Sequence, residues 1–156
     1  MKDIMTIASY ICNRYRAEQG ERIDEMKLHK LLYFAQRESL IRTGEPLFDG
    51  ELQGWSLGPV AVGIRKAYAD DSFDAAVSDA DLGEDKATLD YVFENYARKD
   101  SWSLSRLSHG EICWKKSRQG VAPNESGSNV IPLDDIRLDA ERIKERRDML
   151  NRYGLL

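Results

Sequence analysis

Apolar residues recur at helical spacing along most of the chain, and this pattern predicts a mainly α protein. A first amphipathic helix is expected to end near Gly20, and its inward face consists of Ile4, Ile7, Ala8, Ile11 and Tyr15. Asp24 is a residue type that caps helix starts, and Gly44 is one that ends helices. They would bound a second helix, whose broad apolar face consists of Met26, Leu28, Leu31, Leu32, Ala35 and Leu40.

Four further helices are expected in the rest of the chain. Pro59 suits the first turn of a third helix, which would carry Val60, Ile64 and Tyr68. A fourth helix would carry Leu89, Val92, Phe93 and Tyr96, and Ser101 would cap a fifth with Leu104 and Leu107. The last helix, over about residues 134–153, would start at Asp134 or Asp135 and bury Ile136, Ala140, Ile143, Leu150 and Tyr153.

Three segments between these helices lack a helical pattern. Residues 45–60, EPLFDGELQGWSLGPV, are rich in Gly and Pro and read as loop or short extended structure, and NVIPL (129–133) reads as a brief extended run. A solvated loop with a short ordered piece is expected where acidic residues gather, at Asp70, Asp71, Asp74, Asp79, Asp81, Glu84 and Asp85. The sequence therefore predicts a single compact domain over residues 1–156, with about six helices and a short extended or hairpin element at most.

Composition excludes several classes of protein. Of the 156 residues, 42% are hydrophobic and 32% are charged, which is typical of a globular chain. The net charge of −4 disfavours nucleic acid as a partner of the whole protein, because such proteins need a basic face. No apolar run approaches the roughly 20 residues of a membrane span, and no signal-peptide pattern is present. With Cys12 and Cys113 as its only cysteines, the chain is expected to be cytoplasmic, with free thiols and no membrane partner.

The histidines and cysteines are the residues to consider for a metal site. His109 and Cys113 lie four residues apart, which places two ligands on one helical turn, and Cys12 with His29 would complete a set of four. However, neither cysteine has a CxxC partner, and Gly110 interrupts the turn. The sequence therefore predicts no metal, a boundary His29 with a local hydrogen bond, and a buried Cys113 that behaves as a small hydrophobe.

Motifs of common enzymes are missing from the sequence. There is no G-x-S-x-G nucleophile elbow, no P-loop and no G-x-G-x-x-G. Either cysteine could pair with His109 in the fold, and a serine could pair with either histidine, but no spacing singles such a pair out. We therefore expect no enzyme activity and no cofactor. A small hydrolase stays open as a third interpretation, after a protein-binding module and a nucleic-acid-binding regulator.

The order and spacing of several short segments resemble a known family. KLHKLLYFAQ (27–36), GEPLF (44–48), GWSLGPV (54–60), Tyr68 and LSRLSHGEICW (104–114) together resemble the Panacea antitoxin domain, the SocA-like family that includes phage-associated GepA-like proteins. The resemblance spans about residues 4–114. The positions that fit the family are Lys27, Leu28, Lys30, Leu31, Leu32, Tyr33, Gly44, Pro46, Leu47, Phe48, Trp55, Gly58, Pro59, Val60, Leu104, Leu107, His109 and Trp114.

This resemblance implies a mostly helical antitoxin of a toxin–antitoxin system, which neutralises a nearby-encoded cognate toxin by direct binding. It implies no catalysis and no cofactor. Some relatives present their toxin to a protease as adaptors, so a protease is a second candidate partner. Most motif positions also have plain structural reasons, such as the core stripe of Leu28, Leu31 and Leu32, so the motif is expected mainly to build the scaffold.

The partner-binding surface is expected where basic residues and tryptophans mix. The segment over residues 98–118 carries Arg98, Lys99, Arg106, Lys115, Lys116 and Arg118 together with Trp102 and Trp114. Trp and Arg are enriched among the residues that dominate binding energy. The candidate partner-binding residues are Trp55, Trp102, Arg106 and Lys115. Two alternatives stay open at this point: a regulator that binds nucleic acid through the Arg98–Arg118 stretch, and a solvated face with its tryptophans in the core.

Overall fold

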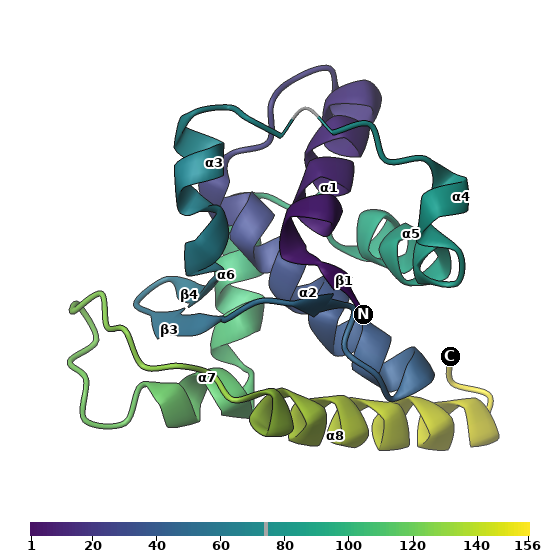
Figure 1. The fold of residues 1–156 in the computed structure, drawn as a ribbon. Coiled ribbons are helices and arrows are strands. Elements are labelled where there is room, and N and C mark those ends of the chain that lie inside the picture. Colours follow the sequence, from purple (N-terminus) through teal and green to yellow (C-terminus); the bar gives the residue numbers. More distant parts are fainter. Residues whose placement is uncertain (74) are drawn as a thin grey trace.

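Figure 1 shows the computed structural model, which describes residues 1–73 and 75–156, so Asp74 of the acidic segment lies outside the described residues. The helices are α1 (Ile4–Gln19), α2 (Glu25–Thr43), the 3-10 turn η1 (Val62–Ile64), α3 (Arg65–Ala69), α4 (Asp79–Leu82), α5 (Asp85–Asn95), α6 (Ser101–His109), α7 (Ile112–Ser117) and α8 (Leu133–Arg152). The strands are β1 (Lys2–Asp3), β2 (Phe48–Asp49), β3 (Gln53–Trp55) and β4 (Gly58–Val60). Helices hold 60% of the chain, which confirms the mainly α class.

Local capping sets the ends of α2. The Asp24 carboxylate accepts a hydrogen bond from the Lys27 backbone N–H at 2.8 Å, which satisfies one of the free donors of the first turn. Gly44 follows the last turn with a φ of 76°, a left-handed conformation that glycine adopts without strain. Gly20 ends α1 in the same way. The predicted bounds of both helices are therefore confirmed.

α2 occupies the centre of the fold. It contacts α1, α5, α6, α8 and β4, and Figure 1 shows α8 crossing below it while α1 and α5 lie above. Every residue from Lys27 to Leu40 is buried, so the helix has no face left to solvent. The sequence predicts one broad apolar face, whereas the structure buries the polar positions as well. The largest core cluster therefore forms around a helix that also carries charges.

Two short pairs of strands complete the fold. β1 pairs in parallel with β2, and β3 pairs with β4 as an antiparallel hairpin. The Gln36 amide of α2 holds the segment at β2, because its oxygen accepts from the N–H of Leu47 at 2.8 Å while its nitrogen donates to the Phe48 carbonyl at 3.0 Å. The extended run expected near residue 130 is confirmed as a bridge between Gln53 and Val130.

The prediction that Pro59 starts a helix is wrong. Gly58–Val60 form β4, because they pair with Gln53–Trp55 across the hairpin turn. The chain becomes helical only at η1, beginning with Val62. A partner strand that lies five residues away in the sequence therefore overrides the local helix-start signal of Gly58-Pro59.

The predicted caps of α6 and α8 are also wrong. Asp100 caps α6, since its carboxylate accepts from the Ser103 N–H at 2.9 Å, and Ser101 instead donates to the Asp24 carboxylate at 2.8 Å. α8 begins at Leu133, so both expected cap aspartates lie within its first turn. There their negative charges interact favourably with the positive end of the helix dipole.

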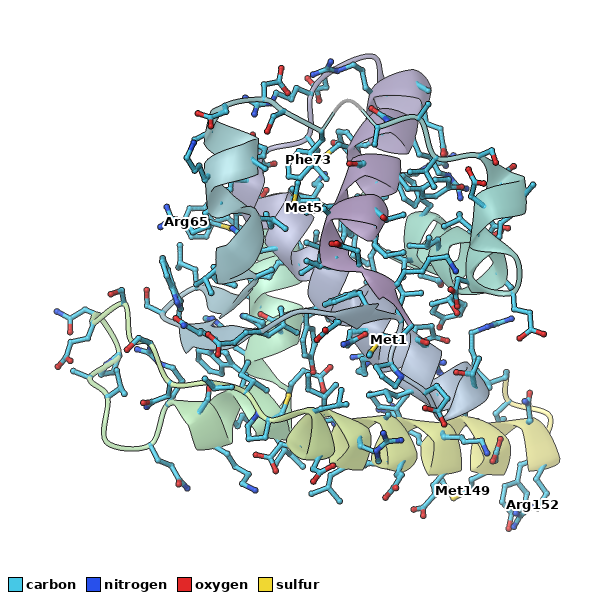
Figure 2. All side chains as sticks on the ribbon, in the orientation of Figure 1. Met1, Met5, Arg65, Phe73, Met149 and Arg152 are labelled. Atoms are coloured by element: carbon cyan, nitrogen blue, oxygen red, sulfur yellow. The ribbon has the colours of Figure 1, made fainter. Side chains whose placement is uncertain are left out.

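The C-terminal end of α8 is more exposed than the sequence predicts. Tyr153 is 68% exposed rather than inward, and Ile143 and Leu150 are only half-buried, whereas Ile136 and Ala140 are buried as predicted. Figure 2 shows Met149 and Arg152 pointing away from the rest of the molecule. α4 is the short ordered piece expected in the acidic segment, and α7 is a helix that the sequence did not separate from α6. No helix within the described residues is long and apolar enough to cross a membrane.

Truncating the buried leucines of α2 should destabilise the protein strongly. Leu31 and Leu32 are both 0% exposed, so Leu31→Ala or Leu32→Ala should lower the free energy of unfolding by about 2–5 kcal/mol through lost burial and a cavity. Urea denaturation measures this change. Leu138→Ala is the matched control, because Leu138 is 56% exposed on α8, and its change should stay within about 0.5 kcal/mol. Equal effects at the three positions would contradict the central placement of α2.

Candidate partner-binding site

The turn of the β3–β4 hairpin is held by side chains from α6 and α7. The Trp114 indole N–H donates to the carbonyl of Trp55 at 2.9 Å. The Ser105 hydroxyl donates to the carbonyl of Leu57 at 2.7 Å. These bonds satisfy backbone acceptors that the short two-stranded ladder leaves free, and they fix the turn against two helices.

Lys30 of α2 lies beneath the same turn. Its Nζ donates to the Pro59 carbonyl at 3.2 Å, and the residue is 1% exposed. Gly58 adopts a φ of 121° above it, and a Cβ there would lie 2.4 Å from Ser108 Oγ and 2.6 Å from Lys30 Cε. Only glycine therefore fits at this position, both for its backbone conformation and for the space.

His109 packs against Trp114 at the edge of the turn. The two rings are stacked, with centroids 4.1 Å apart. Burial lowers the pKa of His109, and the positive charge of Lys30 lowers it further. The imidazole is thus a neutral packing element at pH 7. The motif residues Lys30, Gly58, Pro59, His109 and Trp114, which are far apart in the sequence, meet around one hairpin.

His29 is buried rather than at the boundary, with 3% of its surface exposed. The Ala61 N–H donates to its Nδ1 at 3.2 Å, so the ring proton sits on Nε2, which lies 2.8 Å from the Glu25 carboxylate. The expected local hydrogen bond is therefore confirmed. Burial lowers the pKa of His29 to about 4, although Glu25 acts in the opposite direction. The ring is neutral and bridges α2 to the segment after β4.

A pocket of about 180 Å³ opens between the N-terminal half of α2 and the hairpin turn. Its walls are mainly apolar, and its lining includes Met26, His29, Lys30, Trp55, Leu57 and Val60. The Trp55 ring is half-buried, and the guanidinium of Arg65 lies 4.9 Å above it. Figure 2 shows Arg65 at the outer surface, at the start of α3.

The four predicted partner-binding residues lie on elements that contact this hairpin. Trp55 is in β3, Trp102 and Arg106 are one turn apart on α6, and Lys115 follows Trp114 on α7. Trp102 is 61% exposed, so the alternative that it is a core residue is wrong. Arg106 and Lys115 are exposed as well. Their role in binding stays a prediction.

Arg118 does not belong to the exposed basic stretch. It is 9% exposed, and its guanidinium donates to the carbonyls of Gly54, Ala122, Glu125 and Ser126 at 2.7–3.0 Å. It therefore ties the loop after α7 to β3. Lys116 is also engaged, in an ion pair with Asp135 of α8 at 3.0 Å.

The cysteines and histidines do not gather into a ligand set. Within residues 1–73 and 75–156, no three His, Cys, Asp or Glu side chains are placed so that they could hold a metal ion. Cys113 is 0% exposed and lies 3.2 Å from the Tyr33 hydroxyl, which confirms its prediction as a buried residue. Burial raises the pKa of Cys12 to about 11 and that of Cys113 further, so neither thiol is activated as a nucleophile.

Sequence reasoning missed the ionic contacts that fix α7 and α8. The Asp139 carboxylate of α8 is 0% exposed and accepts from the N–H groups of Ile112 and Cys113 at 3.1 and 2.7 Å, which caps α7. Arg37 of α2 pairs with Glu111 just before α7. The sequence feature that could have revealed these contacts is the pair of charged residues Arg37 and Glu38 among the apolar residues of α2. Charges at such positions indicate buried partners elsewhere in the chain.

Comparison with known families identifies the protein class. The family model for the SocA-like antitoxin, Panacea domain, matches residues 28–115 of the 156, from the first turn of α2 to α7. The chain therefore belongs to this antitoxin-like family, as its sequence motifs predict. Searches among curated proteins and among solved structures return no match. The matched range contains the hairpin, most of the residues that line the pocket and all four candidate partner-binding residues.

Acid should destabilise the protein through His29. Its pKa is 6.5 when unfolded and about 4 when folded, so the unfolded state binds the proton first and stability falls as the pH drops from 6.5 to 4. The full loss from this one group is about 3 kcal/mol. Denaturation at pH 7, 5.5 and 4.5 measures it. His29→Gln, which does not titrate, should be mildly destabilised at pH 7 and should lose less stability than the wild type on acidification. Parallel pH curves for the two proteins would contradict the buried neutral imidazole.

Gly58→Ala should destabilise the hairpin turn by at least about 2 kcal/mol, because it adds both backbone strain and a clash with Ser108. Gly63→Ala is the matched control, since a Cβ there meets no atom within 4 Å. Its stability should be unchanged or slightly higher. Thermal melts of the two variants measure the difference, and equal melting temperatures would show that the turn tolerates a side chain.

Proposed function

We propose that this chain is the antitoxin of a toxin–antitoxin pair and neutralises its cognate toxin by direct binding. The observation that carries the proposal is the family match over residues 28–115. We also propose that residues 1–156 act as one domain, because α8 packs along α2. Presentation of the bound toxin to a protease would extend the same binding role.

The exposed surface beside the hairpin supports this role. Trp102 presents a large exposed ring on α6, and Arg106 lies one helical turn further on. Exposed aromatic and basic residues on a rigid helix suit the anchors and the steering charges of a protein interface. The net charge of the whole chain is −4, so the positive charge around Arg106 is confined to a local part of the surface.

Binding rather than catalysis is the form of activity that the described side chains support. Both thiols have raised pKa values, and both histidines have lowered ones because of burial. The imidazoles are engaged in packing and in backbone hydrogen bonds. Ser105 Oγ lies 3.5 Å from His109 Nε2, but this hydroxyl donates to the Leu57 carbonyl at 2.7 Å and so does not give its proton to the imidazole as an activated nucleophile would.

Co-expression tests neutralisation. The protein encoded beside this chain is expressed alone and together with it, in a host with and without its major cytosolic proteases. Growth arrest that the chain relieves in both hosts, with a purified complex of the two proteins, is the expected result. Relief only in the protease-containing host would replace direct neutralisation by the adaptor role. Arrest that persists in both hosts would overturn the proposal.

Trp102→Ala should weaken the complex with that partner by at least about 2 kcal/mol while leaving the melting temperature unchanged. Charge reversal, Arg106→Glu with Lys115→Glu, should slow association, and more so at low salt. Tyr153→Ala, just after the end of α8, is the matched control, because that ring is 68% exposed but lies outside the proposed surface. Titration calorimetry and stopped-flow association measure the two effects. Equal losses for Trp102→Ala and Tyr153→Ala would move the interface to α8.

Binding to nucleic acid is the alternative outcome. The exposed basic stretch that would contact nucleic acid is smaller than the sequence predicts, because Arg118 is buried and Lys116 forms an ion pair with Asp135. An electrophoretic shift on DNA upstream of the coding region, at physiological salt, separates the two functions. A specific shift without any protein complex would favour the regulator.

A further inference from the structure

Two lysines three residues apart on α2 are both buried, but they are used differently. Lys27 is 6% exposed, and its ammonium donates to the Tyr15 hydroxyl and to the Ala97 carbonyl, both at 3.1 Å. Its charge also lies 5.1 Å above the Tyr15 ring. Lys30 is 1% exposed, and its ammonium donates to one acceptor of the described residues, the Pro59 carbonyl at 3.2 Å. An ammonium has three donors, so Lys30 is the less satisfied of the two.

Lys30 forms no ion pair with a carboxylate of the described residues. Glu25, which lines the same pocket, is already engaged by His29 at 2.8 Å and by Arg65 at 3.0 Å. His29 is neutral because burial lowers its pKa to about 4. Glu25 is thus already paired with Arg65, which lies outside the pocket over the Trp55 ring, and does not neutralise Lys30. Burial lowers the pKa of Lys30 to about 8, so its ammonium is still mostly protonated at pH 7. A buried cation without a counter-ion is costly, which indicates a function other than stability.

The size and walls of the pocket limit what can enter it. Its volume of about 180 Å³ lies below the range of roughly 300–1,000 Å³ that is usual for small-molecule and cofactor sites. It suits one amino-acid side chain or one chain end. Met26, Trp55, Leu57 and Val60 make its walls apolar, and Leu57 at the turn is 40% exposed, so the pocket reaches the surface.

We propose that this pocket binds a carboxylate of the protein partner, with Lys30 as its counter-ion and the Trp55 and Leu57 side chains around the adjoining apolar group. The carboxylate accepts hydrogen bonds from the two N–H groups of the Lys30 ammonium that have no acceptor among the described residues. This inference rests on the proposed function, since the partner is the cognate toxin. The proposal gives Trp55 a role in the interface, as a wall around the apolar group next to the carboxylate. It also adds Lys30 to the interface, although the sequence assigns that residue to the scaffold.

Capped dipeptides test the pocket without the toxin. The probes are acetyl-Leu-Glu-amide, which offers an acidic side chain, acetyl-Leu-Leu with a free carboxylate, which offers a chain end, and acetyl-Leu-Gln-amide as the neutral control. The indole N–H resonances of Trp55 and Trp102 are followed by NMR during titration. Saturable shifts of Trp55 with one or both carboxylate probes, at least about tenfold tighter than with the neutral probe, are expected. Whichever carboxylate probe binds tighter identifies the source of the group. Equal binding of all three probes, or of none, would overturn the proposal.

Lys30→Met and Lys27→Met form a matched pair of variants. Lys30→Met removes an under-satisfied buried charge, so its melting temperature should stay level or rise while carboxylate binding falls at least about tenfold. Lys27→Met breaks two hydrogen bonds, so its melting temperature should fall, while its folded fraction binds the probes normally. Unchanged probe binding by Lys30→Met, or a lowered melting temperature equal to that of Lys27→Met, would show that Lys30 is structural.

The complex with the toxin completes the test. Lys30→Met should weaken it at least about tenfold, and Lys27→Met should not. If the wild-type chain forms no complex while the carboxylate probes bind, the proposed function has failed and the partner's part of this inference fails with it. If the complex forms and Lys30→Met leaves its affinity unchanged, the proposed function stands and the pocket is not where the toxin binds.

Discussion

Burial of α2 on all sides from Lys27 to Leu40 is the constraint on which the rest of this structure depends. A helix segment without a solvent face needs partners inside the protein for most of the charges it carries, because an isolated buried charge costs several kcal/mol. Arg37 pairs with Glu111 near α7, and Glu38 accepts from Arg147 of α8 at 2.8 Å. These contacts bring distant segments onto one helix in a fixed register. The packing of α6, α7 and α8 thus follows from the charges of α2 as well as from its leucines.

The same constraint explains why the family motif and the candidate site coincide. Lys30 and His29 belong to the buried helix, but their hydrogen bonds reach Pro59 and Ala61, on either side of the end of β4. Trp114 and Ser105 hold the other side of the turn. A rigid central helix and two short helices therefore fix a hairpin that would be only marginally stable alone. Rigid support of this kind reduces the entropy that a binding surface loses when a partner docks.

The features that the sequence predicts well are those set by neighbours along the chain. Asp24 and Gly44 bound α2 through contacts within one turn, and their residue types are sufficient to place them. Pro59 misleads because its strand partner, Gly54, acts across the hairpin, and Ser101 misleads because it bonds Asp24, 77 residues away. The pocket depends on two segments that are distant in the sequence, the N-terminal half of α2 and the hairpin. Its lysine could be recognised from the sequence as part of a motif, but not as a buried group with spare donors.

Asp139 links the C-terminal helix to the hairpin through a short series of bonds. It caps α7 by accepting from Ile112 and Cys113, and the next residue, Trp114, holds the carbonyl of Trp55. Local opening of the first turns of α8 therefore removes the cap of α7 and weakens one of the bonds that hold the turn, the one from Trp114 to Trp55. Amide protons of α7 and of the hairpin should exchange with solvent at the rate set by α8, as one cooperative unit. A change confined to α8 would in this way be transmitted to Trp55 without touching it.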